Sequence, residues 1–147
     1  MNKSEITSAN HKGWPLLFAT WLVAASATLG SLFFSEIMDV PVCKLCWYQR
    51  IAMYPLALIL AMGLFPYDHR AVRTAVVLTA AGWLIALFHT LLIAGIIPEN
   101  AQPCVQGIPC SETHITLLGF LNIPLISLLT FSLIGALLYF AQRMESS

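Results

Sequence analysis

Apolar residues gather in four long runs along this chain of 147 residues, and short polar segments separate the runs. The apolar runs cover residues 14–34, 51–65, 74–97 and 115–141. About 20 consecutive apolar residues are enough for a helix to cross the hydrocarbon core of a bilayer. The pattern therefore predicts an all-α protein, an integral membrane four-helix bundle that forms a single membrane domain over residues 1–147.

The second run is too short to span a membrane by itself. Residues 51–65 rise only about 22 Å at 1.5 Å per residue, whereas the hydrocarbon core is about 30 Å thick. This helix must therefore begin about one turn earlier, near Cys46, and Arg50 then lies close to the hydrocarbon edge. The predicted helices are residues 14–34, 46–65, 74–97 and 115–141.

The first run was compared with a secretory signal peptide. Two lysines precede it, and Ala25-Ser26-Ala27 resembles a small-residue cleavage site. Apolar sequence nevertheless continues through Thr28–Phe34, which is longer than the 7–15-residue apolar region of a signal peptide. We expect a retained membrane helix.

Composition and charge support a membrane protein. Hydrophobic residues make up 59% of the chain and charged residues only 10%, compared with roughly 25% charged residues in soluble domains. The mean hydropathy is +0.80. The formal net charge is zero, and no basic cluster is present, so nucleic acid is not an expected partner.

The basic residues predict the orientation of the bundle. One predicted side of the membrane carries Lys3, Lys12, Arg70, Arg73 and Arg143. The other side carries only two basic residues, both in the first connecting segment. Positively charged residues favour the cytoplasmic side, so both termini are expected in the cytoplasm. Both cysteine-bearing loops then lie on the extracytoplasmic side, where disulfides persist.

The first of these loops contains Cys43 and Cys46 as a C-x-x-C pair, and Arg50 follows four residues after Cys46. Backbone amides at a helix start and nearby cations can lower the pKa of a thiol. Cys46 and Arg50 would share one face of the helix. The pair alone is compatible with redox chemistry, with half of a zinc site, or with an inert staple.

The second loop contains Cys104 and Cys110, with Gly107 between them. A disulfide stabilises a chain less when the loop it closes is short, so a purely stabilising bridge is less expected here, which favours thiol–disulfide exchange between the two pairs. A zinc site formed by all four cysteines, with His114 as a substitute ligand, is the competing interpretation. Our prediction contains no metal site.

Electrons that reach the cysteines need an acceptor, and the chain has no flavin or nicotinamide fingerprint. Quinone is available in a membrane, and Arg50 could support its reduced oxygen; a snorkelling arginine is the alternative. His89 is an ionisable residue within the third helix and a candidate for the same site, or it simply bonds two helices together. Tyr54-Pro55 and Asn122 with Pro124 could shape a cleft, although ordinary kinks and interhelical bonds explain them as well.

These residues resemble the DsbB family of disulfide bond formation proteins, in its BdbC-type branch. The most specific match is the segment CKLCWYQRI at 43–51, followed by Met53-Tyr54-Pro55. His89-Thr90, the Pro103–Cys110 loop and Asn122-Ile123-Pro124 also match, and the resemblance covers all four predicted helices. The second loop is short, as in the BdbC branch, whereas the other branch has a longer loop with an extra surface helix.

The resemblance implies a quinone-reducing thiol–disulfide oxidoreductase of the bacterial cytoplasmic membrane. A DsbA- or BdbD-like thioredoxin-fold partner would be reoxidised by Cys104 and Cys110, with Cys104 the first point of attack. Cys43 and Cys46 would then reoxidise that pair and pass electrons to ubiquinone or menaquinone, with Arg50 beside Cys46. The remaining alternatives are a thiol-based metal-binding membrane protein and a redox protein similar to vitamin K epoxide reductase.

Overall fold

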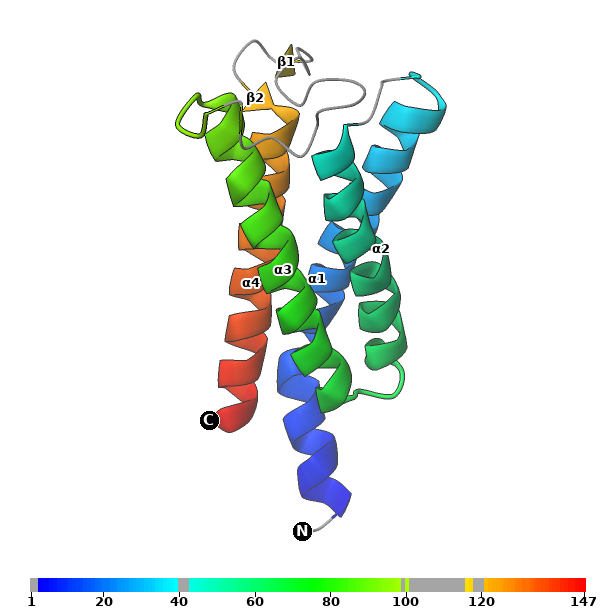
Figure 1. Ribbon diagram of the computed structural model, residues 1–147. Coiled ribbons are helices and arrows are strands. Elements are labelled where there is room, and N and C mark those ends of the chain that lie inside the picture. The colour runs from blue at the N-terminus through cyan, green and yellow to red at the C-terminus, as the bar shows by residue number, and fades with distance from the viewer. Residues whose placement is uncertain (1–2, 40–42, 99, 101–115, 118–120) are drawn as a thin grey trace.

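In the part of the chain that the structure describes, four helices form a bundle in which consecutive helices run antiparallel (Figure 1). The computed structural model describes residues 3–39, 43–98, 100, 116–117 and 121–147. The helices are α1 (Lys3–Glu36), α2 (Lys44–Leu64), α3 (His69–Ile93) and α4 (Ile123–Ser146). Two very short strands, β1 (Thr116–Leu117) and β2 (Leu121–Asn122), pair antiparallel before α4, with Thr116 opposite Asn122.

The helices pack as a ring in which α1 contacts α2 and α4, and α3 contacts the same two helices. Both ends of the chain and the connection from α2 to α3 lie at one end of the bundle (Figure 1). The start of α2, the end of α3 and the strand pair lie at the opposite end. The predicted four-helix architecture is confirmed, and the basic residues of α3 and α4 lie at the end opposite to Cys43 and Cys46.

Apolar side chains cover both the inside and the outside of the bundle. The interior is filled by fully buried residues such as Leu17, Leu56 and Phe131. Large apolar side chains also point outward, and Leu58 and Leu84 are more than 60% exposed. All four helices are long and apolar enough to cross a membrane. A helix bundle that is apolar all round matches lipid as its surroundings, so the chain is a multi-pass membrane protein.

Helix α3 begins and ends four to five residues earlier in the sequence than the predicted helix of residues 74–97. It begins at His69, because the Asp68 side chain accepts a hydrogen bond from the Arg70 N–H and caps the helix. It ends at Ile93, because Gly95 adopts a φ of 75°. The N–H groups of Gly95 and Ile96 then bond the carbonyls of Leu92 and Leu91 and close the helix.

The other helix starts also differ from the apolar runs. Helix α4 begins at Ile123 rather than at residue 115, because Thr116–Leu117 belongs to a strand. Pro124 suits the first helical turn, since its fixed φ is helical and its missing N–H is not needed there. Helix α1 extends beyond its apolar run to Lys3. Helix α2 begins at Lys44, which confirms that it starts well before residue 51.

Candidate redox site

Cys43 caps the start of α2. Its backbone is extended, with φ −72° and ψ 163°, and its Sγ accepts a hydrogen bond from the Cys46 N–H at 3.4 Å. The Cys43 carbonyl accepts the first helical bond, from the Trp47 N–H. When the first cysteine of a C-x-x-C segment is the N-cap of a helix, the second cysteine is the third helical residue. The N–H group of that residue bonds the N-cap side chain, so the two cysteines lie close together.

The two sulfurs of this pair lie 2.9 Å apart. Both residues are free thiols, since a disulfide would bring the sulfurs to about 2.05 Å. The hydrogen bond from the Cys46 thiol, together with contacts to His89, lowers the pKa of Cys43 to about 4, against the opposing effect of burial. Cys43 is therefore the sulfur that carries negative charge in the reduced pair.

His89 of α3 lies directly against Cys43. Its Nε2 is 3.8 Å from Cys43 Sγ, and its Nδ1 is 3.2 Å from the amide nitrogen of Gln49. The imidazole is completely buried. Because α3 ends at Ile93, His89 lies only four residues, or about 6 Å, from the helix end. The helix end predicted at residue 97 would have placed His89 eight residues, or about 12 Å, from the end of the helix.

Gln49 is a site residue that the sequence reasoning missed. It is only 6% exposed, although glutamine is usually a surface residue. The available signal was its position: Gln49 follows Cys46 by three residues and so lies on the same face of α2. A polar residue that shares a helix face with a buried cysteine is a candidate for a buried hydrogen bond.

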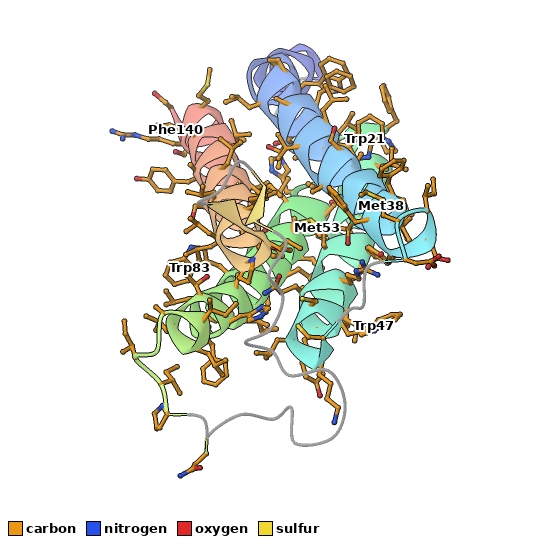
Figure 2. The ribbon with its side chains drawn as sticks, turned by 90° about the horizontal axis from the view of Figure 1, so that it is seen from above. Trp21, Met38, Trp47, Met53, Trp83 and Phe140 are labelled. Carbon is orange, nitrogen blue, oxygen red and sulfur yellow. The ribbon has the colours of Figure 1, made fainter. Side chains whose placement is uncertain are left out.

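Arg50 points toward α1 rather than toward α3. Its guanidinium donates to the Ser31 carbonyl at 2.9 Å and to Ser35 Oγ at 3.1 Å. It also lies over the ring of Trp47, with 5.7 Å to the ring centroid. Figure 2 shows Trp47 on the outside of the bundle and Met53 within it. Arg50 therefore joins α1 to α2 while it remains partly exposed beside the Cys46 turn.

The remaining predicted residues divide into two groups. Cys104, Cys110 and His114 lie outside the residues that the structure describes. Tyr54 lies one turn after Arg50 on the same face of α2, and its buried hydroxyl has no hydrogen-bond partner among the described residues. Pro124 is fully buried in the first turn of α4.

A metal ion is a second possible occupant of this site. The ligand atoms of Cys43, Cys46 and His89 all lie within 4.8 Å of one another. Two sulfurs and one imidazole nitrogen are a ligand set that Zn²⁺ accepts, with one position left open.

Comparison with known proteins identifies the family. The family model of the disulfide bond formation protein DsbB matches residues 13–141. The chain belongs to the DsbB family. A probable disulfide formation protein of Metapseudomonas resinovorans is 44% identical over 131 residues, which cover 88% of this chain and 91% of the relative. Disulfide bond formation protein C of Bacillus subtilis (strain 168) is 44% identical over 120 residues, covering 80% and 86%. No solved structure gave a significant match.

Membership in the DsbB family confirms the resemblance and fixes the class of reaction. Proteins of this family are oxidoreductases that act in disulfide formation. Together with its four membrane-spanning helices, this makes the chain a membrane disulfide oxidoreductase. The free thiol pair at the start of α2 is the part of the described structure where such chemistry can occur.

Proposed function

We propose that this DsbB-family protein reoxidises a soluble thioredoxin-fold partner, similar to DsbA or BdbD, and transfers the electrons to membrane quinone. Cys104 and Cys110 receive the electrons from the partner dithiol, and the Cys43–Cys46 disulfide then oxidises that outer pair. The observation that carries this proposal is the Cys43–Cys46 pair, with its sulfurs 2.9 Å apart at one end of a membrane bundle. Such a pair can open and close a disulfide with little movement of the backbone.

The residues beside Cys46 fit a quinone. Arg50 donates two of its five N–H groups to α1, and Tyr54, one turn deeper, offers a buried hydroxyl that has no partner among the described residues. These two residues would hold the quinone, and its chemistry when bound is to accept two electrons and two protons. The charge of Arg50 would favour the reduced oxygen, while Cys46, one turn earlier on α2, would supply the electrons.

The orientation of the protein is part of the proposal. Both termini lie in the cytoplasm of a bacterium, and the cysteine end of the bundle lies outside the cytoplasmic membrane. The distribution of Arg70, Arg73 and Arg143 at the opposite end supports this orientation. A thiol pair on that side meets the oxidising compartment in which secreted proteins gain their disulfides.

The proposal is tested with the purified full-length protein in lipid nanodiscs. A reduced thioredoxin-fold partner from the same genome is added with ubiquinone or menaquinone, and quinone reduction is followed by absorbance. We expect turnover with at least one quinone, and trapping of the partner on Cys104 in a Cys110→Ala variant. A trapped partner on Cys43 would reverse the proposed order of transfer.

The cluster of Cys43, Cys46 and His89 also supports a second candidate function, the binding of a thiophilic metal ion. The two functions are separated by measuring metal content and quinone reduction on the same preparation. Stoichiometric zinc together with no turnover on any quinone would favour metal binding and would overturn the redox proposal.

A further inference from the structure

The hydrogen bond between Gln49 and His89 determines which ring nitrogen of His89 carries a proton. The amide nitrogen of Gln49 can only donate, and it lies 3.2 Å from Nδ1. Nδ1 therefore accepts this bond, and the proton of the neutral ring lies on Nε2. Nε2 is the nitrogen that lies 3.8 Å from Cys43 Sγ. The ring thus presents an N–H group to the sulfur.

We propose that His89 is a catalytic residue of thiol–disulfide exchange at Cys43, and that Gln49 is the positioning residue that holds its Nε2–H toward the sulfur. The arrangement has the logic of a cysteine–histidine–amide triad, in which the third group fixes the tautomer and orientation of the ring. The inference rests on the proposed redox function and assigns roles to two residues within it.

The burial of these groups supports a defined geometry. Cys43 is 1% exposed, His89 is 0% exposed and Gln49 is 6% exposed. Away from water, a hydrogen bond between ring and amide is costly to leave unmade, so Gln49 restrains the ring strongly. The apolar residues around the pair, Leu45 and Leu92, are also buried, which strengthens the effect of the Nε2–H group on a sulfur anion.

The exchange step illustrates what His89 does. An incoming thiolate of a dithiol forms a bond to Cys46 Sγ, the Cys43–Cys46 bond breaks, and its electron pair remains on Cys43 Sγ. The Nε2–H of His89 donates to this sulfur and makes Cys43 a better leaving group. The second thiol of the dithiol then attacks the mixed disulfide and releases Cys46, whose sulfur takes up the proton that this thiol loses, so the reduced pair holds a Cys43 thiolate and a Cys46 thiol. The dithiol is oxidised by two electrons, and the protein pair is reduced by two.

The first test measures exchange without quinone or partner. In a Cys104→Ser/Cys110→Ser background, the oxidised full-length protein in nanodiscs is reduced by dithiothreitol in a stopped-flow experiment. Gln49→Leu should slow the reduction roughly tenfold, the equivalent of one lost hydrogen bond of about 1.4 kcal/mol. His89→Phe should slow it of order a hundredfold, as expected when a hydrogen-bond donor that stabilises a developing anion is removed.

A matched control separates this effect from a general loss of packing. Thr79 is a buried polar residue of the same helix α3, and its hydroxyl bonds only the carbonyl of Ala75 among the contacts described. Thr79→Val therefore removes a buried polar group without touching the cysteines. It should leave the rate of reduction by dithiothreitol within about twofold of the parent, since distant sites act independently.

The second test observes the tautomer directly. With ¹⁵N-labelled histidine, and His89→Phe to assign the signals, His89 should show a protonated Nε2 and an unprotonated Nδ1. Gln49→Leu should remove this preference, whereas Gln49→Glu should give a protonated Nδ1, because a carboxylate only accepts. A protonated Nδ1 in the parent protein, or an unchanged spectrum and rate in Gln49→Leu, would overturn the inference. The parent protein's turnover with quinone tests the proposed function separately.

Discussion

The two sides of α2 at its cysteine end differ in polarity and in exposure. On the side that faces α3, Cys43 and Gln49 are buried, and each contacts one ring nitrogen of the buried His89 of α3. On the side that faces α1, Arg50 is partly exposed, and within the described part of the chain its bonds to Ser31 and Ser35 leave further N–H donors unused. Under the proposed function, this helix end carries two separate tasks: stabilising a sulfur on the inner side, and offering a cationic edge to an electron acceptor on the outer side.

The cysteine pair connects these two sides, and its removal should have the largest effect. Either Cys43→Ser or Cys46→Ser should lower quinone-linked turnover by at least about a thousandfold, as expected when a reacting group is removed. Quinone reduction with a thioredoxin-fold partner measures this. The Cys46→Ser variant should still contain an acidic Cys43, because a serine hydroxyl can donate the same hydrogen bond.

Cys104→Ser/Cys110→Ser is the control for this prediction. It should lose turnover with the partner, while dithiothreitol should still reduce its Cys43–Cys46 disulfide. Substantial partner-linked turnover without Cys43 would show that the described thiol pair is not an obligatory step.

Substitutions of Arg50 test the proposed role of the side of α2 that faces α1. Arg50→Ala should raise the quinone KM roughly tenfold, the equivalent of one charge-assisted hydrogen bond, and should also lower thermal stability because the link to Ser31 and Ser35 is lost. Arg50→Lys keeps the charge but not the planar set of donors, so its quinone KM should lie between those of the parent protein and Arg50→Ala. An unchanged KM in Arg50→Ala would reduce Arg50 to a clamp between helices.

Gly82→Ala provides a control that affects stability alone. A Cβ at Gly82 would collide with the ring of Phe131 where α3 packs on α4. Overpacking of this kind costs about 1–3 kcal/mol. Gly82 lies seven residues, or about 10 Å, from His89 along α3, so the variant should unfold more easily and yet keep the parent quinone KM.

The helices and Arg50 show how much of the structure could be predicted from the sequence alone. The four helices were predictable, because long apolar runs have few alternatives to membrane helices. The early start of α2 followed from the thickness of the bilayer. The orientation of Arg50 toward α1 was not predictable, because it depends on how two helices pack. The sequence showed that Arg50 lies four residues after Cys46, but it did not show that Arg50 would face α1.

The errors at helix ends have local causes. The end of α3 depends on the positive φ of Gly95, and Gly95 was visible in the sequence as a possible helix terminator. The apolar residues beyond it concealed that signal. Gln49 was overlooked for a different reason: its burial arises only from the packing of α2 against α3, which places it opposite His89.

Ser35 allows a finer test of the outer side. Its hydroxyl accepts one of the two Arg50 bonds to α1, and the Ser31 carbonyl accepts the other. Ser35→Ala should lower the free energy of unfolding by about 0.5–1 kcal/mol and raise the quinone KM no more than about threefold, because the guanidinium keeps its remaining bond. Thermal unfolding and quinone titration measure the two effects. A larger rise in KM than in Arg50→Ala would indicate that Ser35 itself contacts the acceptor.

The smallest expected effect is a change in how steeply the reduction potential falls with pH, and it separates the two sides of α2 most clearly. Because the Cys46 thiol and His89 lower the pKa of Cys43 to about 4, reduction of the disulfide above that pH takes up one proton for two electrons. The reduction potential should then fall by about 30 mV per pH unit, rather than the about 59 mV that two protons would give. A lowered thiol pKa stabilises the folded, reduced state fully above the ordinary cysteine pKa, and this stabilisation is lost as the pH falls through the lowered value.

Redox equilibration with dithiothreitol in the Cys104→Ser/Cys110→Ser background measures this slope across the pH range. His89→Phe removes one group that lowers the pKa of Cys43, so the pH at which the slope steepens should move upward. Arg50→Lys keeps its charge on the opposite side of α2 and should leave that pH unchanged. A slope of about 59 mV throughout would mean that both sulfurs are protonated in the reduced pair. In that case the buried side of α2 would not hold a sulfur anion, and the division of tasks between its two sides would be wrong.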